Sequence, residues 1–447
     1  MQSNRLKGRG RKILVLYRTL EYPLRATIAD HLFSFRRWSD ADCIYVNVAS
    51  QPVPHVLARM PFDLIVFHTT LLSSRVRNNR FQRLMSQLEF LSESRAVRIA
   101  LPQDEHVFTT NLCEFIERLA VDNVLSVAPK ITWPAIYDTV DRSKVAIHQV
   151  LTGYLEPRTL RRIEQLASTK PKDRAIDVGY RAHGVRHNLG YHGQLKIEIA
   201  RAFLAAAQGQ DLRTDISTQF EDTFLGDSWY QFLLRCRYVL GIEGGASLHD
   251  PTGEISRCVQ RYVAEHPHAL FDEVEAACFP GSDGAFPLVA LSPRHLEAVA
   301  TRTGQLLVSG DYNGILEPGT HYVPIDKDLG NLGELVRNSM DESDRLRMVE
   351  RAYDDIVVSG RYTYQRFVDL VLRTSLQTQH VTGCPARAST EPWNPLRAAG
   401  VRCAGWIGWL FPLVIGVGAR ALHVLARRGP RSLGRFLRRV EKRVRGK

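Results

Sequence analysis

The chain lacks the short motifs that identify several large enzyme classes. It contains no Walker phosphate loop, no GxSxG nucleophile elbow and no HExxH zinc motif. Its seven cysteines include no CxxC pair and no metal-ligand spacing, which argues against a cysteine-built metal site. From that cysteine pattern we expect reduced thiols in a cytoplasm-like compartment.

The middle of the chain also lacks excess charge, although the net charge is +12. Residues 427–447 carry +9 and residues 1–12 carry +5, so residues 13–426 carry −2. A nearly neutral body argues against a nucleic-acid-binding fold, and the basic ends suit an anionic surface. For the N-terminal end, a solvated arm is the simpler interpretation. We expect no signal peptide, because the start, MQSNRLKGRGRK, leads directly into a strand.

With 447 residues, the chain is long enough for two domains and a tail. Short runs rich in Val, Ile and Leu alternate with amphipathic stretches, which predicts two α/β domains with parallel sheets. The expected strands are 12–17, 43–48, 64–69, 98–101 and 123–127, then 175–180, 212–217, 238–243, 287–292, 305–310 and 321–325. The expected organisation is a basic tail (1–11), a first Rossmann-like domain (12–170), a second (171–374), a linker (375–395) and a C-terminal tail (396–447).

The C-terminal tail holds the longest uncharged run of the chain. Residues 403–419 read CAGWIGWLFPLVIGVGA, 17 residues without a charge, at the lower edge of what spans a bilayer. Trp406 and Trp409 near one end and arginines at the other are typical of a membrane interface. We expect a membrane-embedded or interfacial anchor; the alternative is a helix folded back on the catalytic body.

Residues just after the strands of the second half are the first candidates for binding, because ligands bind beyond the carboxyl ends of open parallel sheets. Arg181 follows the first of these strands, and Lys196 lies near the start of the next helix, so together they could bind a diphosphate. Glu243 and Asp250 lie in EGGASLHDPTGE, where paired glycines allow close approach of a ligand. A solvated basic loop and ordinary turn chemistry are the alternatives.

The segment Ser292-Pro-Arg-His-Leu-Glu297 is the most informative of the chain. It predicts the end of a strand followed by a helix whose second residue is Arg294 and whose first turns carry Glu297. A carboxylate there can accept hydrogen bonds from ribose hydroxyls, although a single helix glutamate is most often merely exposed. The loop 310–317, which contains Tyr312, follows the next strand and is long enough to line a cleft.

In the first half, His68 follows the third strand, and Asp104 and Glu105 follow the fourth. They are candidates for a general base. A lone histidine at a strand end is more often structural, and adjacent acids face different ways, so at most one of Asp104 and Glu105 is expected to act. Asp40-Ala-Asp42 spells a DxD metal motif but precedes a strand, at the wrong end of the sheet for a ligand.

These motifs resemble those of bacterial GT-B glycosyltransferases of the family 1/family 4-like type. The resemblance rests on SPRHLEAVATRTGQLL, GILEPGTHYVPI and AYDDIVVSGRYTYQRF, and on ALPQDEHVFTTNL in the first half, and covers most of residues 12–372. It implies that Glu297 binds the donor ribose, that Arg181 and Lys196 bind the diphosphate, and that Ser292 and Arg294 lie at a phosphate. Many relatives carry a second glutamate eight positions earlier, where this chain has Val289.

The resemblance implies a hexosyltransferase that moves a sugar from a nucleoside-diphosphate sugar to an acceptor hydroxyl. No metal or other cofactor is expected, because cations and a helix dipole can stabilise the leaving diphosphate. We expect a glycan or lipid-linked acceptor, a role in polysaccharide biosynthesis, and attachment through the tail to the inner face of the cell membrane. The alternatives are a sugar-nucleotide epimerase or hydrolase of the same architecture, and a non-catalytic membrane-attached binding protein.

Overall fold

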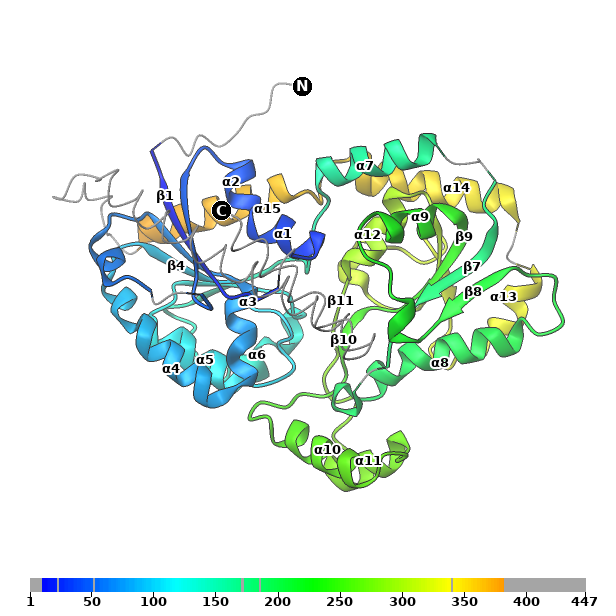
Figure 1. The fold of residues 1–447 in the computed structure, drawn as a ribbon, viewed down its shortest axis with the longest axis horizontal. Coiled ribbons are helices and arrows are strands. Elements are labelled where there is room, and N and C mark those ends of the chain that lie inside the picture. Colours follow the sequence, from blue (N-terminus) through cyan, green and yellow to red (C-terminus); the bar gives the residue numbers. More distant parts are fainter. Residues whose placement is uncertain are drawn as a thin grey trace, which may run out of the picture.

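The computed structural model describes residues 10–21, 24–50, 53–169, 173–184, 186–338 and 341–381. They form two α/β domains, one blue to cyan and the other green to yellow, with helix α7 (Pro157–Ser168) leading from the first to the second (Figure 1). Each domain is built on a parallel sheet. This confirms the expected pair of parallel-sheet domains, which fit the GT-B architecture.

The N-domain sheet has the strand order β2-β1-β3-β4-β5-β6. Its central strands are almost entirely buried, and β3 (LIVF) and β5 (NVLS) are buried at every residue, because helices cover both faces. The edge strand β6 reads AIHQ and is half-exposed; it has no apolar run, so the hydrophobic pattern did not predict it. The strands are β1 (Lys12–Tyr17), β2 (Asp42–Asn47), β3 (Leu64–Phe67), β4 (Val97–Ala100), β5 (Asn123–Ser126) and β6 (Ala146–Gln149).

The helices of the N-domain are mostly short, and several connections contain single 3-10 turns. The longest, α4, is strongly amphipathic and buries Phe81 and Met85 against the sheet. The helices are α1 (Ala26–Leu32), α2 (Ser34–Trp38), α3 (Thr69–Leu72), α4 (Asn78–Leu88), α5 (Thr109–Arg118) and α6 (Trp133–Ile136), and the 3-10 turns are η1 (His55–Arg59), η2 (Ser73–Val76), η3 (Glu89–Glu93) and η4 (Lys130–Thr132).

The C-domain sheet has the strand order β13-β12-β9-β7-β8. Its strands are β7 (Ile176–Arg181), β8 (Thr214–Ser217), β9 (Cys236–Gly241), β12 (Gly304–Val308) and β13 (Val323–Ile325). The helices around it are α8 (Tyr191–Ala206), α9 (Asp227–Arg235), α12 (Pro293–Ala300), α13 (Leu332–Asn338) and α14 (Glu342–Tyr353), with the short turns η5 (His187–Leu189), η6 (Phe220–Asp222), η7 (Tyr312–Gly314) and the π-helical η8 (Asp354–Val358).

The prediction that residues 287–292 form a strand of the parallel sheet was wrong in the pairing of this strand. Its residues Leu288–Ala290 form β11, which pairs antiparallel with β10 (Gly244–Ala246) outside the main sheet. Gly245 has φ +121°, and a Cβ there would overlap the carbonyl oxygen of Leu288. Only glycine allows this close backbone pairing, so Gly245 serves the strand pair.

The last described helix, α15 (Tyr364–Val381), returns from the C-domain to the N-domain. Phe367, Val368 and Val371 are buried against Ile13 and the other residues of the blue sheet, and Figure 1 shows α15 in orange beside it. The sequence-based boundary at residue 374 assigns this helix to the second domain, because an amphipathic pattern does not say which sheet a helix covers. Since α15 packs on the N-domain, the chain crosses between the domains twice.

A helical hairpin is inserted between β10 and β11, and the sequence did not predict it. Helices α10 (Glu254–Glu265) and α11 (Phe271–Cys278) protrude below the two domains in Figure 1. Val259, Val274 and Phe279 form their small core, and a disulfide joins Cys258 to Cys278. The expectation that all cysteines are reduced thiols was therefore wrong: a bridge closes a hairpin whose own core is small.

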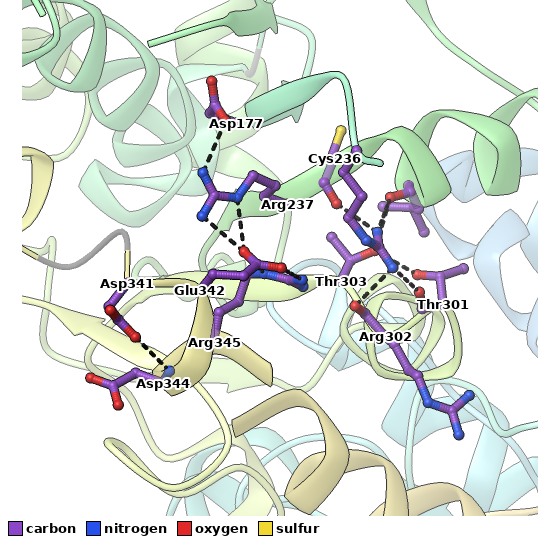
Figure 2. Close-up of polar contacts among 12 residues, drawn as sticks. Asp177, Cys236, Arg237, Thr301, Arg302, Thr303, Asp341, Glu342, Asp344 and Arg345 are labelled. Carbon is purple, nitrogen blue, oxygen red and sulfur yellow. Dashed lines mark hydrogen bonds and ion pairs between the residues drawn. The ribbon is translucent and has the colours of Figure 1, made fainter. Parts of the chain in front are cut away.

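Ion pairs fasten α14 to the amino edge of the C-domain sheet, at the end opposite the strands' carboxyl ends. Arg237 on β9 lies between Asp177 on β7 (3.2 Å) and Glu342 on α14 (2.8 Å). Arg345 binds the same Glu342 carboxylate, as Figure 2 shows. This edge is occupied by structural contacts, which leaves the carboxyl edge for binding.

The expected linker beyond residue 381 and the apolar run 403–419 lie outside the described residues. Among the residues that the structure describes, no helix is both long enough and apolar enough to cross a membrane.

Candidate active site

Two cavities meet where the carboxyl edges of the two sheets face each other. The C-domain cavity, of about 440 Å³, is lined by the end of β7, Lys196, Trp229, Arg294 and the start of β10. The interdomain cavity, of about 290 Å³, is lined by His31, His68 and Asp104 from the N-domain and by β10 and β11. Gly244 and Ser292 line both cavities. Together they are of the size that holds a small-molecule ligand.

Lys196 and Arg294 bring two positive charges to the C-domain cavity. Burial lowers the pKa of Lys196, and the neighbouring Arg294 guanidinium lowers it further, while Asp104 acts in the opposite direction. Arg294 is exposed, donates to the carbonyl of Arg181 (2.7 Å) and lies over the ring of Trp229. Within the described residues neither cation is in an ion pair. Two unneutralised cations side by side favour an anionic ligand.

Ser292 is the N-cap of α12, with Pro293 at its first position as predicted. Its N–H donates to Nδ1 of buried His295 (3.1 Å). This capping interaction fixes the turn that presents Arg294 to the cavity and directs the positive end of the α12 dipole toward it.

The guanidinium of Arg181 is turned into the C-domain rather than left free for a ligand. It binds the Asp215 carboxylate (2.6 Å) and carbonyl (2.8 Å) and lies over the rings of Phe224 and Phe232. Its Nε is buried and has no partner among the described residues. The side chain lines the cavity wall, but its charge is already neutralised.

The N-terminus of α8 is also occupied. The N–H of Tyr191 donates to Asp283 (2.7 Å) and that of His192 donates to Ser247 (3.0 Å). Both acceptors come from the inserted segment between β10 and β11. These two backbone donors at the start of α8 are therefore already bonded, and Lys196 is the group of α8 that can bind a ligand in the cavity.

Glu243 lines the C-domain cavity and is paired with Tyr312, which is buried behind it. The carboxylate of Glu243 accepts the backbone N–H of Tyr312 (2.7 Å), and the Tyr312 hydroxyl donates to the carbonyl of Val308 (2.7 Å). Burial raises the pKa of the Glu243 carboxyl. Tyr312 is fully buried and lines neither cavity. The two residues hold the 310–314 loop against the sheet.

Asp250 joins the domains instead of facing the C-domain cavity. Its carboxylate accepts the backbone N–H of Ser256 (2.8 Å) at the start of α10. Its own backbone pairs with the N-domain, donating to the carbonyl of His106 (2.7 Å) and accepting from the N–H of Phe108 (2.8 Å). Asp250 is thus a structural link between α10 and the loop that carries Asp104.

Glu297 lies on α12, on the side away from the C-domain cavity. It lines a separate small space between the domains with Tyr230 and Tyr364, and it accepts a hydrogen bond from the indole N–H of Trp229 (2.8 Å). Burial raises its pKa from 4.5 to about 7, against the opposing effect of Trp229. Trp229 lines the C-domain cavity and Glu297 does not. The contact of Glu297 with the residues around that cavity is its hydrogen bond to the Trp229 indole.

The raised pKa of Glu297 predicts a pH-dependent stability. Between pH 4.5 and about 7 the folded protein keeps a proton that the unfolded chain releases, so this contribution to stability falls as pH rises and levels off above pH 7. Between pH 5 and pH 8 we expect this group to lower the unfolding free energy of the wild type by an amount on the order of 2 kcal/mol. Glu297→Gln should not show this decrease. Urea unfolding of wild type and variant at each pH measures it. Exposed Glu334→Gln is the control; parallel wild-type and Glu297→Gln profiles would contradict the prediction.

His68 is fully buried in contact with His31, a residue that the sequence analysis did not select. His68 Nδ1 accepts the N–H of Thr70 (3.2 Å), so its Nε2 donates to His31 Nδ1 (2.9 Å). Burial and the neighbouring His31 lower the pKa of His68. Burial lowers that of His31 to about 4. Both rings are neutral at pH 7. His31 and His68 both line the interdomain cavity.

Asp104 and Glu105 face different ways, as expected. Asp104 is exposed at the interdomain cavity with φ +54°. The Glu105 carboxylate is buried and accepts from Ser126 Oγ (2.5 Å) and the N–H of Val127 (3.0 Å), and from the Tyr137 hydroxyl. Burial raises the pKa of Glu105. Asp104 is therefore the carboxylate of this pair that a ligand in the cleft can reach.

Trp229, residues 182–184 and Arg186 also line the C-domain cavity and were not selected from the sequence. In the sequence, only their position beside a strand end or a helix start indicated that they could lie at the site. Asp42 is the first residue of β2 and lies at the amino edge of the sheet, away from both cavities. Within the described ranges, no group of three or more His, Cys, Asp or Glu could hold a metal ion.

No known family model matches this chain, and no curated protein matches it. Among solved structures, Anabaena Alr3699/HepE in complex with UDP-glucose is 10% identical, with a TM-score of 0.44, over 81% of this chain and 99% of that one. The E. coli trehalose-6-phosphate structure bound with UDP-2-fluoro glucose is 11% identical, with a TM-score of 0.45, over 82% and 99%. An α1,3-fucosyltransferase is 8% identical, with a TM-score of 0.42, over 84% and 93%. Likenesses this low do not identify the family or activity of this chain.

Proposed function

We propose that this chain is a glycosyltransferase that takes its sugar from a nucleoside-diphosphate sugar. The observation that carries the proposal is the junction of the two cavities at Gly244 and Ser292. It places the unpaired cations Lys196 and Arg294 on one side and the exposed carboxylate of Asp104 on the other. The resemblance of residues 292–319 to the donor segment of GT-B glycosyltransferases supports the same assignment.

In this proposal the donor occupies the C-domain cavity. Lys196 and Arg294 bind the diphosphate, and the dipole of α12 adds to their field. As the glycosidic bond to the phosphate breaks, negative charge grows on the leaving nucleoside diphosphate. The same cations stabilise that charge more strongly than the ground state, which lowers the barrier.

The acceptor enters from the N-domain side, where Asp104 is the general base. Asp104 accepts the proton of the attacking hydroxyl while the acceptor oxygen bonds to the anomeric carbon and the nucleoside diphosphate leaves. The charge of Asp104 acts to raise the pKa of Lys196, so the proposed base of the N-domain lies close to the proposed phosphate-binding cation of the C-domain. Neutral His31 and His68 line the same cavity. Both ring nitrogens of His68 are already bonded, so His31 Nε2 is the group that can donate to a hydroxyl of the acceptor.

A donor screen tests the proposal. UDP-, GDP-, ADP- and CMP-sugars are each added to the full chain, and the shift of the melting temperature is measured. We expect a UDP-, GDP- or ADP-sugar to raise the melting temperature by several degrees, since binding to the folded state stabilises it. The CMP-sugar carries a single phosphate, so a shift with it alone would contradict the diphosphate site. No shift with any donor would overturn the proposal and favour a non-catalytic binding protein. Rapid turnover of the bound donor without an acceptor would favour an epimerase or hydrolase.

We also propose that the acceptor is a membrane-associated glycan or glycolipid. Support comes from the sequence of the tail, with its uncharged run 403–419 and basic end. A chain ending at residue 395 that still sediments with membranes would contradict this part.

A further inference from the structure

A third, larger cavity opens beside Asp104 on the side away from β11. This α10 groove, of about 1030 Å³, runs between the N-domain loops at Asn78 and Asp104 and the C-domain residues Arg186, Asn188, Arg257 and Gln260. Asp104 lines both this groove and the interdomain cavity, and Arg186 lines both this groove and the C-domain cavity. All three spaces therefore converge near the proposed reacting atoms.

The inserted hairpin forms one wall of the groove. Asp250 bonds to the backbone of His106 and Phe108 in the N-domain and also to the N–H of Ser256 in α10. The Phe108 ring lies so close to Gly253 that a Cβ at Gly253, with φ +80°, would overlap it. These contacts place α10 at a fixed position opposite the Asp104 loop, so the groove has two positioned walls.

Polar groups in the groove wall lack partners. The imidazole Nδ1 of His187 and the side-chain oxygen of Asn188 are buried and have no hydrogen-bond partner among the described residues. A buried polar atom without a partner costs about 1–3 kcal/mol. The side-chain N–H of Asn188 donates to Ser256 Oγ (2.9 Å). This bond fixes the amide group, so the Asn188 oxygen cannot turn toward a different donor.

The charges of the groove favour a negative ligand. Arg186 and Arg257 are exposed, and within the described part of the chain neither forms an ion pair; Asp104 is the one carboxylate among the residues lining it. Arg77 directly precedes the lining residue Asn78. Burial and then the charges of Arg77 and Arg80 lower the pKa of Arg18, so positive charge also accumulates beside the groove.

We propose that the α10 groove binds the acceptor, and that the acceptor is an extended saccharide carrying carboxylate or phosphate groups. The proposal rests on the proposed glycosyl transfer. The groove is larger than either cavity at the junction and ends at the proposed base, so it holds several sugar units and directs one hydroxyl to Asp104. The arginines bind the anionic groups bidentately, and the inserted hairpin determines which chain is accepted.

Saturation-transfer NMR and calorimetry with three soluble probes test the proposal without any donor. The probes are hyaluronan hexasaccharide (carboxylated), pentamannosyl phosphate (phosphorylated) and maltohexaose (neutral). We expect one charged probe to bind at least tenfold more tightly than maltohexaose at low salt, and the better probe to identify the anionic group. Arg257→Ala should remove this preference. Binding of no charged probe, or equal binding of all three, would overturn the proposal.

A matched pair of variants on one helix locates the binding. Gln260→Trp fills the groove, whereas Arg261→Trp places the same ring on a face of α10 that does not line it. We expect only Gln260→Trp to weaken binding of the charged probe, by at least tenfold. Nucleotide affinity and melting temperature should be unchanged in both variants. If Gln260→Trp binds the probe like wild type, the site is elsewhere. A negative donor screen with intact probe binding would refute glycosyl transfer but not the saccharide site.

Discussion

Replacing Lys196 by alanine is expected to weaken binding of the nucleoside diphosphate about 10- to 100-fold, the effect of losing a charge-assisted hydrogen bond to phosphate. In the free protein Lys196 is partly desolvated and close to Arg294, so its charge is unfavourable until an anion binds. The variant should therefore melt at the same temperature as wild type or higher without nucleotide. Calorimetry with the nucleotide found by the donor screen measures the affinity.

Arg201→Ala is the matched control for this prediction, because Arg201 lies on the same helix α8 but is exposed and does not line the cavity. It should bind nucleotide like wild type. Raising the salt concentration should weaken nucleotide binding by the wild type more than nucleotide binding by Lys196→Ala, since the variant has one charge fewer to screen. Wild-type affinity in Lys196→Ala would refute the assignment of the diphosphate to this cavity.

Most of the architecture followed from the sequence because short apolar runs that alternate with helices favour a sheet buried on both faces. The run 287–292 is an exception, since its strand pairs outside the main sheet. Packing between distant segments did not follow. The apolar side of residues 364–381 suits either sheet, and it is contact with Ile13 and its neighbours that assigns α15 to the N-domain. The hairpin of α10 and α11 is closed by a bridge between Cys258 and Cys278, and a spacing of twenty residues gives no sign of such a pair.

The same limit applies to the site. Lys196, selected near the start of a helix, and Ser292 and Arg294, selected after a strand, line the C-domain cavity, whereas Tyr312, also selected after a strand, does not. Position beside a strand or helix end could not predict the direction of each side chain. Glu243 turns inward because the N–H of Tyr312 needs an acceptor, and Arg181 turns to Asp215. A buried donor or acceptor must be satisfied, and that requirement depends on neighbours that are distant in the sequence.

Asp104 differs from these residues because its side chain forms no hydrogen bond or ion pair within the part of the chain that the structure describes. Its backbone carbonyl accepts from the buried Arg75 (Nη2), as does that of Gln103 (2.8 Å). Arg75 thus fixes the loop through main-chain atoms and leaves the Asp104 carboxylate exposed between the interdomain cavity and the α10 groove. A rigid backbone with a free carboxylate is what a general base requires.

Asp104→Asn is expected to slow release of nucleoside diphosphate from the identified donor by about 10²- to 10⁴-fold, whether water or an acceptor attacks. Asparagine matches aspartate in size and tolerates the positive φ of this position, so nucleotide affinity and melting temperature should stay unchanged. Glu105→Gln is the control: its buried hydrogen bonds make a loss of about 1–3 kcal/mol of stability the expected effect, with turnover retained in the folded fraction. Normal turnover in Asp104→Asn, or a loss explained by weaker nucleotide binding, would assign the proton transfer to another group.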